Sequence, residues 1–254
     1  MSSALRAEGL ALTYPRRSQP VIAAFDLDLA PGEVVAVLGP SGVGKSSLLR
    51  VLAGLAQPSA GRVLVGGEPL RGPHPQIAIA FQDPCLLPWL TLEENVAFGL
   101  DFRSQQRRSR AERRGRVEAA IAAVGLAAAR RLRPAELSGG MASRAALARC
   151  LARSPQVLLL DEPFAALDEV TRADMQRLVE GLIAAQRLAA VLVTHDIDEA
   201  LLLADRVLLL GGMPAMIVGS WVLSQPRPRE ETDPALAALR LEILRCLRAC
   251  LRRL

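Results

Sequence analysis

The sequence predicts an α/β fold with a mainly parallel sheet, and two observations support this expectation. Short apolar runs that end in glycine or aspartate alternate with segments of helical periodicity, which is typical of strands joined by crossover helices. The chain of 254 residues is 51% hydrophobic, so it can bury a sizeable core. Aromatic residues make up only 3% of the chain, so this core must consist of alanine, leucine and valine.

Four segments are expected to form strands. Residues 33–39, 156–163 and 189–196 are continuous apolar runs, as expected of strands that are buried on both faces. Residues 217–224 alternate more loosely and predict a late strand near a sheet edge.

Apolar residues at helical spacing predict helices over 44–55 and 141–153. Residues 85–155 are rich in arginine and alanine, have few strand signals and predict an inserted helical subdomain. The proline-broken stretch 224–234 predicts a linker that precedes an amphipathic helix. The expected organisation is one nucleotide-binding domain over 1–225, with core segments 1–84 and 156–225 and helical subdomain 85–155, followed by the linker and helix over 226–254.

The net charge is +5, and much of the positive charge lies in two arginine-rich runs, at 103–116 and 240–254. A solvated helix face is the preferred interpretation. Contact with anionic lipid, a membrane-protein partner or nucleic acid is the alternative. Because no aromatic residues interleave either run, we expect no nucleic-acid partner.

No run approaches the roughly 18 apolar residues of a membrane span, and the N-terminus lacks the features of a signal peptide. We therefore expect a soluble, cytoplasmic protein. The four cysteines form no C-x-x-C pair; Cys246 and Cys250 would share a helix face, but no histidine lies near them in the sequence. Packing is therefore preferred over a metal site for these two residues.

The stretch "GPSGVGKS" fits the pattern G-x-x-x-x-G-K-[ST] between a predicted strand and a predicted helix. Lys45 is the only lysine of the chain, and the other basic residues are arginines. A compact ammonium fits between two phosphates where a broad guanidinium does not, which explains a lysine at this position. The sequence therefore predicts a phosphate-binding loop. Its expected contacts are Gly39, Pro40, Ser41, Gly42, Val43, Gly44, Lys45, Ser46 and Ser47.

The stretch "VLLLDEP" supplies an acidic strand end, which is where open α/β sheets bind their ligands. Asp161 is placed to hold Mg²⁺ together with the Ser46 hydroxyl. Glu162 is placed to act as the general base for an attacking water. Helix capping is the structural alternative for this acidic pair, but Pro163 makes it awkward.

With "LSGGM" at 137–141, the chain resembles the ATP-binding cassette (ABC) subunits of ABC transporters over about residues 4–225. The resemblance implies a P-loop NTPase (RecA-like) core with a mainly parallel sheet, an antiparallel β edge region and an inserted α-helical subdomain. It also implies ATP and Mg²⁺ as cofactors. Four further positions match family motifs: Gln82 as the Q-loop sensor of Mg²⁺ and water, Asp168 in the D-loop, His195 as the switch histidine, and Tyr14 as the aromatic that stacks on adenine.

In the family, the signature residues complete the nucleotide site of a second copy. The resemblance therefore implies a head-to-tail dimer that encloses two ATP molecules. Lys45, Asp161, Glu162 and His195 would come from one subunit. The partner would contribute Ser138, Gly139 and Gly140, which precede a predicted helix whose free N–H groups suit a phosphate.

Several stretches, such as "FQDPCLLPWLTLEENVAFGL", resemble importer cassettes of the nitrate, sulfonate, taurine and thiamine-precursor group. The resemblance implies a peripheral subunit at the cytoplasmic face of the inner (cell) membrane. Its partners would be an integral membrane permease and, indirectly, a solute-binding protein. The segment after the Q-loop would seat a permease helix on Leu86, Leu87, Pro88 and Trp89. The alternative for Trp89 is a place in the core of the helical subdomain.

The sequence departs from this group after the signature, where "MASR" replaces the usual Met-Arg-Gln-Arg. Because Ala142 and Ser143 remove polar groups near the partner's nucleotide, we expect lowered ATPase activity. An unchanged turnover after Arg and Gln are restored at these two positions would contradict this expectation.

Two other functions remain as alternatives. A soluble cassette that acts on nucleic acid or the ribosome is disfavoured because the chain has one cassette and no long insertion. A non-hydrolysing structural subunit is disfavoured because Glu162 and His195 are both present. A GTPase is disfavoured because the Asn-Lys-x-Asp motif would need a second lysine.

Overall fold

The computed structural model describes residues 3–15, 19–100, 109–230 and 232–251. Its centre is a six-stranded sheet in the order β10-β9-β3-β8-β7-β6. Strands β9, β3, β8, β7 and β6 pair in parallel, whereas β10 pairs antiparallel to β9 at the edge. The bounds are β3 Val34–Leu38, β6 Ile77–Ala80, β7 Val157–Asp161, β8 Ala189–Val193, β9 Arg206–Gly211 and β10 Met216–Val222. The expected α/β class with a mainly parallel sheet is confirmed.

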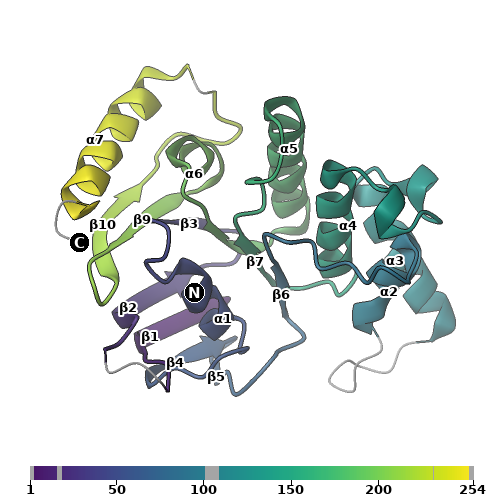
Figure 1. Cartoon of the computed structure of the whole chain (residues 1–254), viewed down its shortest axis with the longest axis horizontal. Coiled ribbons are helices and arrows are strands. Elements are labelled where there is room, and N and C mark those ends of the chain that lie inside the picture. The colour runs from purple at the N-terminus through teal and green to yellow at the C-terminus, as the bar shows by residue number, and fades with distance from the viewer. Residues whose placement is uncertain (1–2, 16–18, 101–108, 231, 252–254) are drawn as a thin grey trace.

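A second, four-stranded sheet has the order β2-β1-β4-β5 and is antiparallel throughout. Its strands are β1 Leu5–Leu12, β2 Ile22–Leu29, β4 Ala60–Val65 and β5 Glu68–Pro69. In Figure 1 this sheet and helix α1 (Lys45–Leu52) lie on one side of the large sheet. Buried side chains of both sheets and α1 form a common apolar core. This sheet is the antiparallel region that the family resemblance implies.

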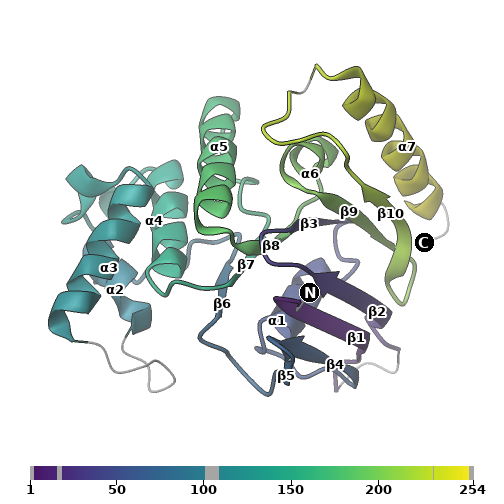
Figure 2. The same ribbon diagram turned by 180° about the vertical axis from the view of Figure 1, so that it is seen from behind.

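Helices of the segment between β6 and β7 form a separate lobe, shown in teal in Figures 1 and 2. Here lie α2 Leu92–Ala97, α3 Arg110–Ala123 and α4 Gly139–Leu151, with short 3₁₀ turns at Phe98–Leu100, Ala127–Ala129 and Pro134–Glu136. Both α2 and α3 begin at capping boxes, formed by Thr91 with Glu94 and by Ser109 with Glu112.

Helices α5 (Glu169–Gln186), α6 (Ile197–Leu203) and α7 (Pro234–Leu251) lie on the other side of the large sheet. Their buried side chains share one core with the teal lobe. Helix α7 packs against α6, β9 and β10 and buries Leu236 and Ile243. Within the described residues, no helix is long and apolar enough to cross a membrane.

Candidate nucleotide-binding site

Three neighbouring strands bring the predicted site residues together. In the sheet order, β8 lies between β3 and β7, and all three run in parallel. Their carboxyl ends therefore share one edge of the sheet, where such folds bind ligands. The phosphate loop follows β3, the acidic pair lies at the end of β7, and His195 follows β8. The sheet order thus assembles motifs that are far apart in the sequence.

Two glycines of the phosphate loop occupy positions that exclude a side chain. A Cβ atom at Gly39 would lie 2.8 Å from the Leu210 carbonyl oxygen, which is backbone and cannot move aside. Gly44 has a φ of 118° and caps the N-terminus of α1. These residues let the loop turn tightly, so that the amide groups of the α1 N-terminus stay free for an anion.

Lys45 is buried, with 5% of its surface exposed. Its Nζ donates hydrogen bonds to the carbonyl oxygens of Gly39 (2.7 Å) and Pro40 (3.1 Å), and it lies 3.8 Å from Glu162 Oε1. Burial lowers the pKa of Lys45, and the carboxylates of Glu162 and Asp161 oppose this shift. The loop therefore keeps the ammonium within its own turn, ready to exchange carbonyl oxygens for phosphate oxygens.

Asp161 and Ser46 form an oxygen pair next to Lys45. The Ser46 hydroxyl donates a hydrogen bond to Asp161 Oδ1 at 3.0 Å. Burial raises the pKa of Asp161, and the Ser46 hydrogen bond only partly opposes the shift. A carboxylate and a hydroxyl in a partly desolvated place are the hard ligands that Mg²⁺ prefers, so these residues fit that cation.

Glu162 connects Lys45 with His195. Its Oε2 lies 3.2 Å from His195 Nδ1, while its backbone N–H donates to the Val193 carbonyl oxygen at 2.9 Å. Glu162 has a φ of 46°, a conformation that costs energy for a residue with a side chain. The Glu162 carboxylate lies between the Lys45 ammonium and the His195 imidazole.

Of the two further predicted residues, Tyr14 contacts the phosphate-loop region and Gln82 does not contact Ser46 or Asp161. The Tyr14 hydroxyl donates to Ser47 Oγ at 3.0 Å, so the aromatic ring lies beside the phosphate loop. Gln82 is exposed, and no polar contact within the described residues joins it to Ser46 or Asp161. The structure therefore brings Tyr14 to the loop and leaves Gln82 at its margin.

The signature residues lie at the start of α4. Ser138 is the N-cap residue, and its Oγ accepts from the Met141 N–H at 3.3 Å. Asp168 caps α5 in the same way and accepts from both Thr171 N (3.0 Å) and Thr171 Oγ1 (2.7 Å). These hydrogen bonds lower the pKa of Asp168. A Cβ atom at Gly140 would lie 2.6 Å from Thr171 Cγ2, so the start of α4 lies against the first turn of α5, the helix that Asp168 caps.

Three structural residues near the site were not found from the sequence. Buried Asn95 accepts from Leu87 N–H and donates to carbonyl oxygens of the loop before α2. Arg149 of α4 donates to the carbonyl oxygens of Pro84 (2.7 Å) and Cys85 (2.8 Å), just after the Q-loop. Buried Glu199 accepts from the Thr194 hydroxyl at 2.6 Å. No motif announces these contacts, since each joins a side chain to a loop whose path only the fold defines.

Other sequence-based interpretations meet the structure as follows. Trp89 is 66% exposed and so is not part of the helical core. His74 is half-buried, and its ring Nδ1 accepts the Gln76 N–H. In the arginine runs, Arg114 pairs with Glu118, and Arg240 with Asp198. Residues 103–108 and 252–254 of these runs lie outside the described residues.

The phosphate loop, the acidic strand end and the helical lobe together define an ATP-hydrolysing cassette. The chain belongs to the ABC transporter family, whose profile matches residues 22–165. The protein is accordingly an ATPase.

Among its relatives are import proteins of bacteria. The chain is 46% identical over 224 residues to the aliphatic sulfonates import ATP-binding protein SsuB 2 of Burkholderia lata, covering 88% of this chain and 80% of the relative. It is 41% identical over 250 residues to the taurine import ATP-binding protein TauB of Chromobacterium violaceum, covering 95% of each. The nitrate import ATP-binding protein NrtC of Synechococcus elongatus is 45% identical over 208 residues, which are 82% of this chain and 31% of NrtC.

Solved structures of cassettes share the fold. The dimeric ATP-binding cassette MJ0796 in a post-hydrolysis state with ADP and Pi superposes with a TM-score of 0.76 at 29% identity, covering 87% of this chain and all of that one. The cbiO1 structure from Clostridium perfringens, part of the cbiONQ transporter complex, has a TM-score of 0.77 at 27% identity and covers 96% of both chains.

Proposed function

We propose that this protein is the ATP-hydrolysing subunit of a bacterial-type importer and works as a head-to-tail dimer beneath a membrane permease. The observation that carries the proposal is the cluster at the ends of β3, β7 and β8, where Lys45, the Ser46–Asp161 pair and the Glu162–His195 pair meet. The import functions printed for relatives at 41–46% identity support the transport role.

Within this proposal, the residues of the chain divide the work of hydrolysis. Lys45 and the amide groups of α1 bind the phosphates, and Tyr14 provides an aromatic face for adenine. Ser46 and Asp161 would hold Mg²⁺, with Gln82 as a further ligand, and the cation would neutralise charge on the transferred phosphoryl group. Glu162 accepts the proton of the attacking water, and His195 orients Glu162 and contacts the γ-phosphate. Ser138, Gly139, Gly140 and Asp168 would meet the nucleotide of the second copy.

The exposed residues after the Q-loop are the proposed seat for the permease. Trp89 and Pro88 are exposed, while Leu86 and Leu87 are half-buried beneath them. Tryptophan is enriched at protein–protein interfaces, and here it lies next to further apolar residues of the same loop. The proposed location is the cytoplasmic face of the inner (cell) membrane, and a solute-binding protein would complete the system. The names of the relatives favour a sulfonate, taurine or nitrate as solute, with a thiamine precursor as the alternative.

The test is an affinity capture of tagged Glu162→Gln protein from detergent-solubilised membranes, with and without ATP. We expect a stoichiometric polytopic membrane protein, identified by mass spectrometry, whose identity narrows the solute. Trp89→Ala should abolish the capture and retain ATP binding, whereas Leu55→Ala, which removes an exposed apolar side chain elsewhere, should change neither. Capture of ribosomal proteins or nucleic acid in place of a permease would contradict the transport role.

A further inference from the structure

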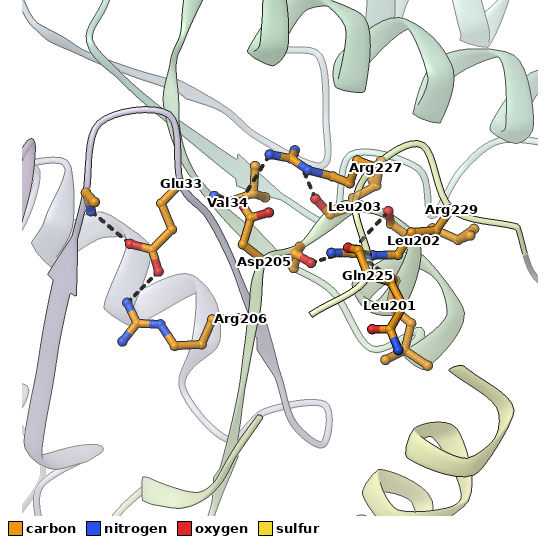
Figure 3. A network of polar contacts seen from close by, with 12 residues as sticks. Glu33, Val34, Leu201, Leu202, Leu203, Asp205, Arg206, Gln225, Arg227 and Arg229 are labelled. Atoms are coloured by element: carbon orange, nitrogen blue, oxygen red, sulfur yellow. Dashed lines mark hydrogen bonds and ion pairs between the residues drawn. The ribbon is translucent and has the colours of Figure 1, made fainter. Parts of the chain in front are cut away.

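The chain after β10 does more than connect the core to the last helix. Residues 224–229, which we call the strap, cross the C-terminal end of α6 (Figure 3). Nη1 of Arg229 donates to the carbonyl oxygens of Leu201 (2.9 Å), Leu202 (3.4 Å) and Ala204 (2.6 Å). The last carbonyl groups of a helix lack partners within it, and a cation is favourable there. Since α6 has no basic residue in its own last turn, Arg229 supplies its cap.

The other arginine of the strap connects α6 with the strand that leads to the phosphate loop. Arg227 donates to the Leu203 carbonyl oxygen at 3.3 Å and to Asp205 Oδ2 at 3.1 Å. The same Asp205 oxygen accepts from the N–H of Val34, the first residue of β3, at 2.8 Å. Figure 3 shows these contacts converging on Asp205. The strap therefore joins α6 to β3 through polar contacts.

Helix α7 contacts the opposite end of α6. Nε of Arg240 donates to Asp198 Oδ1 at 2.6 Å. Asp198 lies in the first turn of α6, and its N–H donates to Oδ1 of Asp196, the N-cap residue, at 2.8 Å. Asp196 directly follows His195. The strap and α7 thus hold both ends of the short helix that begins next to the switch histidine.

The position of His195 depends on this helix. Its side chain is 57% exposed, and its Nδ1 contacts Glu162 Oε2. The residues on both sides of His195 are instead held to α6: Thr194 Oγ1 donates to buried Glu199 and accepts the Asp196 N–H at 3.0 Å. A shift of α6 would therefore move the imidazole relative to the Glu162 carboxylate.

A groove of about 230 Å³, open to solvent, lies between α6 and α7 and is lined by Asp198, Leu201, Leu202, Leu236, Ala237 and Arg240. Core packing holds the buried face of α6, and the polar contacts at its two ends hold it on the side of this groove, where α6 and α7 do not pack closely. We propose that the strap and α7 position His195 for hydrolysis, with Arg229 and Arg240 acting as positioning residues through α6.

This proposal rests on the ATPase mechanism proposed above, and its test separates binding from turnover. The variants are Arg229→Met, Arg229→Lys and, as a matched control, Arg248→Met on the exposed face of α7. In the full-length protein with MgATP, we expect Arg229→Met to lower kcat at least about fivefold while KM and the Kd for ATP stay within about twofold. Arg229→Lys should recover part of the loss, because an ammonium can still reach a carbonyl oxygen, and Arg248→Met should match the wild type.

A double-mutant cycle distinguishes positioning from general destabilisation. In a His195→Ala background, Arg229→Met should lower kcat by less than about twofold, because the residue through which it acts is gone. A further loss as large as in the wild type would overturn the proposal, as would an unchanged kcat in Arg229→Met.

If Arg229→Met does not fold, the same kinetic measurement on Arg240→Gln tests the proposal. This half-exposed side chain can be replaced without opening the core. A lower kcat with unchanged ATP affinity would support the proposal, and an unchanged kcat would overturn it. A wild-type protein that binds ATP and never hydrolyses it would instead contradict the proposed function itself.

Discussion

Replacing Asn95 by leucine should loosen the proposed permease seat and destabilise the fold. Asn95 is fully buried at the start of the helical lobe. Its Oδ1 accepts from Leu87 N–H at 2.8 Å, and its Nδ2 donates to the carbonyl oxygens of Leu87, Leu90 and Thr91 at 3.0–3.2 Å. Leucine has a similar volume, so the change removes the hydrogen bonds while adding little cavity.

The expected magnitude follows from which groups lose their partners. The Leu87 carbonyl also accepts from Leu90 N–H, and the Thr91 carbonyl from Asn95 N–H, so both remain paired. Within the described residues, the hydrogen-bond partner of the Leu87 N–H and of the Leu90 carbonyl is Asn95. An unpaired buried polar group costs about 1–3 kcal/mol. Because this loop lies near the surface and water can reach part of it, we expect a loss of about 3 kcal/mol in the free energy of unfolding.

The assay uses the two tryptophans of the chain. In a Trp221→Phe background, Trp89 is the remaining tryptophan, and its fluorescence anisotropy reports on the loop. We expect Asn95→Leu to lower this anisotropy together with the urea midpoint. Asn95→Asp should cost more than leucine near neutral pH, since its carboxylate would face carbonyl oxygens. A change below about 0.5 kcal/mol with unaltered anisotropy would refute the reasoning.

Three further predictions concern contacts near the site. Gly140→Ala should weaken ATP-driven dimerisation, measured by gel filtration in a Glu162→Gln background. A second substitution, Thr171→Ser, should restore dimerisation, because it removes the methyl group that the new Cβ would meet at 2.6 Å. If Thr171→Ser does not restore dimerisation, this steric cause is excluded. Arg149→Met should speed alkylation of exposed Cys85, read by peptide mass spectrometry, and an unchanged rate would show that Arg149 does not order the loop. Burial raises the pKa of Glu199, so the folded state loses stability as pH rises above the ordinary value of 4.5 and the buried carboxyl must ionise. Glu199→Gln should therefore stabilise the protein at about pH 8 and have little effect near pH 4. Equal urea midpoints of variant and wild type at pH 8 would contradict this.

The chemistry of the site could be predicted from the sequence because it resides in short, contiguous motifs. The apolar run before "GPSGVGKS" predicts β3, and the run in "VLLLDEP" predicts β7. In each case the motif itself marks where the strand ends. Buried strands read as continuous apolar runs, which explains why β3, β7 and β8 were found within a few residues. The shared edge of the sheet then follows from parallel topology.

The supporting contacts could not be predicted, for a physical reason. Arg149, Asn95 and Arg229 bind backbone carbonyl oxygens, and every residue offers such an acceptor. Only the path of the chain selects which carbonyl is within reach. The strap illustrates this, because its prolines correctly predict an irregular segment and say nothing of the helix end that its arginines cap.

The buried ammonium of Lys45 has a consequence for how this protein can be modified. Every other basic side chain is a guanidinium, so the chain offers one side-chain primary amine, and the phosphate loop encloses it. Reagents and crosslinkers that are selective for primary amines can therefore attach to a side chain only at Lys45 in the nucleotide pocket. Bound ATP would protect that position, so the yield of labelled Lys45 would count vacant sites directly, while the exposed surface offers lysine acetylation no target.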